Sequence, residues 1–113
     1  MHELALTEGI LKIVDSEQKK SGFTRVLEIG LSIGEYSGII PDCIEEYFPL
    51  VSKGTTAEGA ALRMEMMPAE FICTECGWTG SMPKHTASCL NCGSTAVRMT
   101  RGREFFVNNL VVE

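Results

Sequence analysis

The chain has 113 residues, of which 44% are hydrophobic, and a formal net charge of −5 at pH 7. This length suggests one domain, and the apolar content is enough for a modest core. Residues 1–67 hold eleven Asp or Glu against six Lys or Arg, so most of the negative charge lies there. An acidic chain lacks the electrostatic footprint of a DNA- or RNA-binding protein, and we expect no nucleic-acid partner.

The first residues, Met1 to Glu8, do not resemble a targeting segment. They contain no basic stretch and carry two acids, unlike a signal peptide. No apolar run in the chain approaches the length needed to span a bilayer. We therefore expect a cytoplasmic protein with reduced thiols and no membrane partner.

The first half of the chain predicts a helix followed by a strand. Residues 4–20 place apolar side chains at i, i+4, i+7 and i+8, which indicates an amphipathic helix, and Gly22 follows as a stop signal. Residues 24–34 alternate Leu or Ile with Glu, Gly and Ser, which is typical of a half-buried strand. The turn sequence that begins at Gly34 ends this strand.

A second helix and a second strand follow. Residues 41–52 predict a helix because Pro41 suits the first helical position and acidic residues favour the N-terminal end. Pro49 predicts a break or kink in it, since proline removes a helical hydrogen bond. Residues 61–67 alternate apolar and charged side chains and predict another strand. Short strands are expected at residues 70–73 and 96–100.

Two copies of one pattern organise the second half of the chain. Cys73-x-x-Cys76-Gly and Cys89-x-x-Cys92-Gly are separated by twelve residues, a spacing that lets four thiolates converge on one tetrahedral metal. The segment between the pairs has too few apolar residues to form its own core. Binding of a structural zinc ion supplies about 10–16 kcal/mol of folding free energy. With four protein ligands the site has no open position for a substrate, so we predict one structural Zn²⁺ per chain.

Other interpretations of the cysteines remain open. Two disulfides would need an oxidising compartment, and a redox dithiol would need only one pair. Iron also accepts four thiolates, and the spacing does not distinguish it from zinc. We interpret the fifth cysteine, Cys43, as a small apolar residue on a helix, and His85 as a solvated loop histidine.

His2 is the second feature that carries metal chemistry. An imidazole at position two lies beside the α-amine and the first backbone amides. Together these nitrogens can chelate a divalent ion in small fused rings. A square-planar, nitrogen-rich site of this kind favours Ni(II) or Cu(II).

Several segments together resemble the HypA family of nickel metallochaperones, which serve [NiFe]-hydrogenase maturation. They are Met1-His2-Glu3-Leu4, the turn from Ile29 to Gly38, the Pro41-Asp42 helix start and the doubled Cys-x-x-Cys-Gly. The resemblance implies that Ni²⁺ binds as transient cargo through His2 and Glu3, chiefly the His2 imidazole and backbone nitrogens. It also implies structural zinc at Cys73, Cys76, Cys89 and Cys92. A carboxylate before the second helix is associated with nickel in the family, for which Glu35 and Asp42 are the candidates.

We therefore predict an α+β fold in which a nickel-binding domain carries an inserted zinc ribbon. The nickel-binding domain comprises residues 1–67 and 104–113, with two helices on a three-stranded sheet. Residues 68–103 form the zinc ribbon, called the metal module below. Residues 104–112 are rich in β-forming apolar side chains and are expected to pair with residues 24–33 or 61–67.

The function that follows is delivery of nickel to a hydrogenase. The chain shows no phosphate-cradling Gly-rich loop and no nucleophile–base pair, so we expect no enzyme activity. The resemblance implies two partners, a nickel-delivery GTPase of the HypB type and the hydrogenase large-subunit precursor. We expect a monomer or a weak homodimer. The alternative is a zinc-ribbon adaptor or nucleic-acid-binding module without a nickel function.

Overall fold

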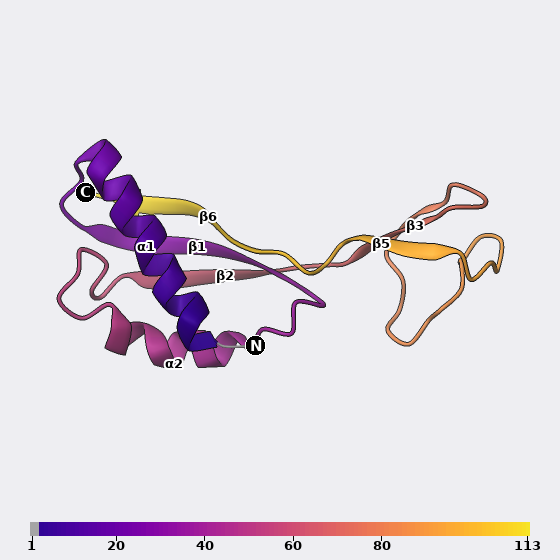
Figure 1. Cartoon of the computed structure of the whole chain (residues 1–113), viewed down its shortest axis with the longest axis horizontal. Helices are drawn as coiled ribbons and strands as arrows, with labels where there is room; N and C mark the ends of the chain where they lie inside the picture. The colour runs from indigo at the N-terminus through magenta and orange to yellow at the C-terminus, as the bar shows by residue number, and fades with distance from the viewer. Residues whose placement is uncertain (1–2) are drawn as a thin grey trace.

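The chain folds into two separate three-stranded sheets, seen at opposite ends of Figure 1. The structure is a computed structural model, it describes residues 3–113, and its extents are 54 × 26 × 17 Å. The sheet orders are β2-β1-β6 and β4-β3-β5. The elements are α1 (Glu3–Ser21), β1 (Val26–Gly34), α2 (Pro41–Val51), β2 (Ala61–Met67), β3 (Glu70–Cys73), β4 (Thr79–Gly80), β5 (Val97–Arg101) and β6 (Phe105–Val112). The predicted α+β fold, with two helices and a three-stranded sheet, is confirmed.

Strand β1 lies at the centre of the larger sheet and supplies the middle of the core. It runs parallel to β2 and antiparallel to β6. Parallel neighbours need a crossover connection, which α2 provides. Ile29, Leu31 and Ile33 of β1 are fully buried and form one cluster with apolar residues of both helices. Burying each such side chain contributes about 1.5–3 kcal/mol.

A bulge in β6 lets the strand cover the core along its length. Gly30 pairs with Asn109 and Leu31 with Val107, so Asn108 is an extra residue. Without it, Val107 and Leu110, three positions apart, would face opposite sides of the sheet. Both instead pack against the core. The expectation that this segment returns to the first sheet is confirmed, with β1 as its partner.

Both helices match their predicted positions, with one correction. Gly22 ends α1 with φ +72°, and its N–H donates to the Gln18 carbonyl (2.7 Å). The predicted break at Pro49 is wrong, because α2 continues to Val51. Pro49 lies in the last turn, so its missing N–H affects a single helical bond, that to the exposed Glu45. Among residues 3–113 neither helix has the length and apolar content needed to cross a bilayer.

The turn after β1 binds both segments that join the two sheets. The Glu35 carboxylate accepts the Ala69 N–H (2.9 Å), and the Tyr36 N–H donates to the Gly102 carbonyl (2.7 Å). The Tyr36 ring meets the Phe71 ring edge-on, with centroids 6.3 Å apart. The sequence predicted that this turn ends a strand, and it did not predict these contacts. In the fold it also attaches the second sheet to the first.

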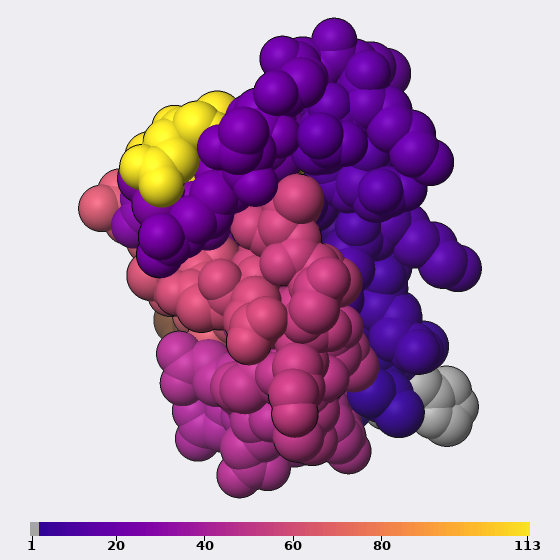
Figure 2. Space-filling model, turned by 90° about the vertical axis from the view of Figure 1, so that its left-hand side faces the viewer, coloured from indigo at the N-terminus to yellow at the C-terminus, as the bar shows by residue number. Residues whose placement is uncertain are grey.

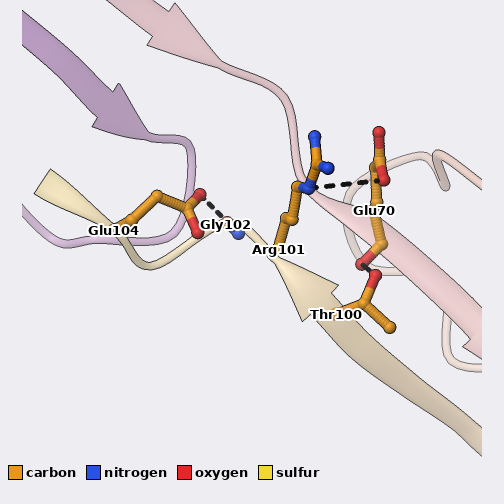
Figure 3. A network of polar contacts seen from close by, with 5 residues as sticks. All are labelled: Glu70, Thr100, Arg101, Gly102 and Glu104. Carbon is orange, nitrogen blue, oxygen red and sulfur yellow. Dashed lines mark hydrogen bonds and ion pairs between the residues drawn. The ribbon is translucent and has the colours of Figure 1, made fainter. Parts of the chain in front are cut away.

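A polar network holds the same junction from within the connecting segments (Figure 3). The Glu104 carboxylate accepts the Gly102 N–H (2.8 Å), and the Thr100 hydroxyl donates to the Glu70 carbonyl (3.2 Å). Arg101 and Glu70 form an exposed ion pair at 3.9 Å, which adds little stability in solvent. The backbone-directed bonds are therefore the main polar contacts of this network.

The close packing at the junction makes Gly34 a test of its importance. A Cβ at Gly34 would overlap the Gly102 carbonyl oxygen, a backbone atom that cannot move aside cheaply. We expect Gly34→Ala to lower the free energy of unfolding by about 1–3 kcal/mol. Thermal and denaturant unfolding measure the loss.

Gly9→Ala is the matched control. Gly9 lies inside α1 with nothing within 4 Å of an added Cβ, so alanine there should stabilise the protein by about 0.5–1 kcal/mol. Equal stability of Gly34→Ala and the unaltered protein would contradict the tight junction.

Candidate metal centre

Four cysteine sulfurs meet at the end of the smaller sheet. The Sγ atoms of Cys73, Cys76, Cys89 and Cys92 all lie within 4.8 Å of one another. Cys73 Sγ is 3.7 Å from Cys92 Sγ, and Cys76 Sγ is 3.6 Å from Cys89 Sγ. Zinc–sulfur bonds of about 2.3 Å in a tetrahedron place the sulfurs about 3.8 Å apart. The cluster therefore has the dimensions of a four-thiolate metal site.

The two Cys-x-x-Cys-Gly segments fold into the same turn. In each, the N–H of the first cysteine donates to the carbonyl five residues on, from Cys73 to Trp78 (2.8 Å) and from Cys89 to Ser94 (2.7 Å). The glycine N–H then returns to the carbonyl of that first cysteine, at 3.0 Å in both turns. Gly77 and Gly93 have φ of +80° and +76°, a conformation that glycine adopts without steric cost. The repeated sequence thus produces two equivalent pairs of inward-facing sulfurs.

Hydrogen-bond donors point at the sulfurs. The Asn91 side-chain amide contacts Cys76 Sγ (3.5 Å), and together with the Trp78 backbone it lowers the pKa of Cys76 to about 6. The Ser94 backbone acts in the same direction on Cys92, but desolvation and the neighbouring sulfurs outweigh it and raise the pKa of Cys92 to about 12. Four thiols this close cannot all ionise unless a cation is present. A bound divalent ion removes that conflict, so the donor set fits a metal.

The geometry also bears on the alternatives. A disulfide needs a sulfur–sulfur distance of about 2.05 Å, far shorter than the distances in this cluster. All five cysteines are free. Cys43 is half-buried on α2 and takes no part in the cluster, and His85 is exposed. The metal-ligating group found within residues 3–113 therefore consists of cysteines alone.

Of the two predicted nickel-binding residues, the structure describes Glu3. His2 lies outside the described residues. The Glu3 carboxylate accepts the Ile40 N–H at the start of α2 (3.2 Å), and the Glu3 carbonyl accepts the Thr7 hydroxyl (2.6 Å). Desolvation raises the pKa of Cys43, and the carboxylates of Glu3, Glu46 and Asp42 raise it further. The first residues of both helices therefore lie close together.

The two other carboxylate candidates lie in different surroundings. Asp42 is exposed in the first turn of α2, within electrostatic reach of Cys43. The Glu35 carboxylate is engaged at the sheet junction through Ala69. Of these two residues, Asp42 is the one that, like Glu3, raises the pKa of Cys43.

Sequence reasoning missed two contributions to these sites. The Asn91 side chain binds a cysteine sulfur, and an amide donor between two cysteines was the available signal. The Glu3 carboxylate joins the starts of α1 and α2, a contact between residues 37 positions apart that no local pattern announces.

The fold and the cysteine cluster define a small α+β metal-binding protein, and comparison with known proteins narrows this class. A family model described as "Hydrogenase/urease nickel incorporation, metallochaperone, hypA" matches residues 1–112. Proteins named hydrogenase maturation factor HypA are similar over the whole chain. One from Acidithiobacillus ferrooxidans is 35% identical with full coverage of both chains, and one from Geobacter metallireducens is 36% identical with the same coverage. The chain belongs to the HypA family, whose members are nickel metallochaperones.

Solved structures agree on the fold. The solution structure of the Ni metallochaperone HypA from Helicobacter pylori matches 99% of this chain and 97% of that chain, with a TM-score of 0.71 at 20% identity. A second solution structure of a HypA protein matches 100% of this chain and 97% of that chain, with a TM-score of 0.77.

Removing one sulfur should empty and unfold the metal module. Cys73→Ser is expected to lower the metal content well below one ion per chain, because three thiolates close a tetrahedral site poorly. Elemental analysis measures the metal, and amide NMR signals of residues 68–103 report the loss of structure.

Cys43→Ser is the matched control, since Cys43 lies outside the cluster. It should keep the full metal content. Retention of a metal ion and of ordered signals by Cys73→Ser would contradict a metal-dependent fold.

Proposed function

We propose that this chain is a nickel metallochaperone that binds Ni(II) at its N-terminus and delivers it during maturation of [NiFe]-hydrogenase. In this proposal His2 is the principal nickel ligand and Glu3 contributes mainly its backbone nitrogen. A structural zinc ion is held by Cys73, Cys76, Cys89 and Cys92. The observation that carries the proposal is the match to a nickel-incorporation family over residues 1–112.

We assign zinc to the cysteine cluster because four protein ligands fill the site and because the cluster has the dimensions of a zinc–thiolate tetrahedron. The sulfur–sulfur distances suit the zinc tetrahedron, and four protein ligands leave no coordination position for another molecule. Zinc is redox-inactive, which suits a site that only stabilises a fold. We also propose that residues 68–103 form a unit that folds on metal binding, whereas residues 1–67 and 104–113 fold around their own core.

Contacts of Glu3 support a role for backbone nitrogen at the nickel site. Its carboxylate is directed to the Ile40 N–H, so that group is already engaged with α2. Imidazole and amide nitrogens of the first residues provide the nitrogen-rich, planar set that Ni(II) favours. The cysteine cluster is a distinct group, formed by the elements of the other sheet.

Delivery requires partners in this proposal. The sequence contains no nucleotide-binding motif, so any energy-dependent step belongs to another protein. We propose a nickel-delivery GTPase of the HypB type for that step and the hydrogenase large-subunit precursor as the recipient. The chain itself acts as a carrier rather than an enzyme. Its nickel must be bound weakly enough to be released to them.

His2→Ala tests the nickel site. In protein whose first residue is Met1, with no tag, this change should reduce nickel binding to the background level, because the imidazole is lost. Isothermal titration calorimetry and the visible absorption of square-planar Ni(II) measure the effect. Zinc content and thermal stability should not change.

His85→Ala is the matched control, since His85 is the only other histidine of the chain and is exposed. It should bind nickel as the unaltered protein does. Nickel binding by His2→Ala at unaltered affinity would refute the N-terminal site.

A further inference from the structure

The apolar surface of helix α2 is wider than the face that the helix buries, although a helix packed on a sheet usually needs only the buried face. Its inner face, with Ile44 and Phe48, is buried in the core. A second, exposed row follows the spacing i, i+7 and i+10 along one flank of this buried face. This row consists of the N-cap residue Ile40 (55% exposed), Tyr47 (36%) and Leu50 (74%), and we call it the exposed stripe of α2. An aligned apolar row of this kind on a solvent-facing helix is typical of a docking surface.

One edge of the stripe is acidic and has no base on its own helix. Glu46 lies one turn before Leu50, and Asp42 lies one turn before Glu46. Both acids are exposed, and residues 41–51 contain no Lys, Arg or His. Within residues 3–113 no ion pair joins these two acids to a basic side chain. The surface therefore offers an apolar row with an uncompensated negative edge.

The stripe begins beside the N-terminal end of α1. Ile40, its first residue, donates its N–H to the Glu3 carboxylate at 3.2 Å. Figure 1 shows α2 along the edge of the larger sheet domain, at the opposite end of the molecule from the metal module, and Figure 2 shows it at the lower edge of the face turned to the viewer. A protein bound along the stripe would thus lie next to Glu3 at the start of α1.

We propose that the exposed stripe of α2 docks a partner protein that presents an apolar surface rimmed by Lys or Arg. Opposite charge speeds encounter and selects the partner, while burial of Tyr47 and Leu50 provides affinity. A second copy of this chain is a poor occupant, because two acidic edges would face each other. The identity of the partner rests on the proposed function, which makes the nickel-delivery GTPase the probe.

The test measures binding of the purified GTPase to the full, untagged chain by calorimetry. Leu50→Asp should weaken binding at least about tenfold, since central apolar contacts typically contribute 1 kcal/mol or more. Glu46→Lys should also weaken binding and should make binding less sensitive to rising salt. Ile13→Asp is the matched control, because Ile13 is a 45% exposed aliphatic residue on the other helix, and it should bind normally.

Two further measurements separate the possible failures. Each variant should keep its melting temperature, its nickel and its metal-module zinc, which shows that fold and cargo are intact.

Unaltered GTPase binding by Leu50→Asp, an equal loss in Ile13→Asp, or no binding by the unaltered chain would each overturn the docking surface. If Leu50→Asp instead converts a dimer to a monomer in light scattering and leaves GTPase binding unchanged, the stripe is a self-association surface and the proposal is wrong. Failure of the unaltered chain to bind nickel would refute the proposed function separately.

Discussion

The antiparallel pairing of β6 with β1 is the interaction on which the arrangement of this chain depends. It joins the last strand to the central strand across the whole intervening metal module, with Val26 opposite Val112 and Ile33 opposite Phe105. At the far end, Thr24 N–H donates to the Glu113 carbonyl (2.8 Å), and Figure 2 shows the end of β6 against the segment that leads into β1. Because both connections of the module return to one sheet, the module is an insertion held at two points. A single flexible linker would have left its orientation free.

The two sheets are stabilised in different ways. The larger sheet has a continuous apolar core beneath two helices. The metal module has no comparable core, because it buries few apolar residues. These are Ala69, Cys73, Met82 and Cys89, and two of them are cysteines of the cluster. A small sheet without a core depends on an added constraint, and a tetrahedral metal provides one. The proposed structural ion would explain how such a module holds its shape at the end of an elongated molecule.

The turn between β1 and α2 links the parts that carry the proposed chemistry. Glu35 and Tyr36 bind the junction with the metal module, and Ile40, four residues later, binds Glu3. One short segment therefore contacts the root of the cysteine module and the start of α1. This arrangement places the exposed stripe of α2 beside the start of α1, while the cysteine cluster lies in the other sheet.

Much of this organisation could be predicted from the sequence because it depends on local patterns. Period-two and period-3.6 apolar spacing predicted β1, β2 and α1, and Pro41 with the acidic residues after it predicted α2. The doubled Cys-x-x-Cys-Gly predicted the cluster. Other features depend on contacts between distant residues. Three such features are the bulge at Asn108, the close approach of Gly34 to Gly102 and the hydrogen bond from Ile40 to Glu3. Pro49 was misjudged because its effect depends on how near it lies to the helix end.

The central claim is that the chain has two distinct metal sites, a closed zinc site and an N-terminal nickel site. Elemental analysis of untagged protein, before and after titration with Ni(II) and removal of the excess, tests it most directly. The account predicts one zinc per chain before titration, and one nickel with the zinc retained afterwards. Loss of one zinc for each nickel gained would place nickel in the cysteine cluster and contradict the account.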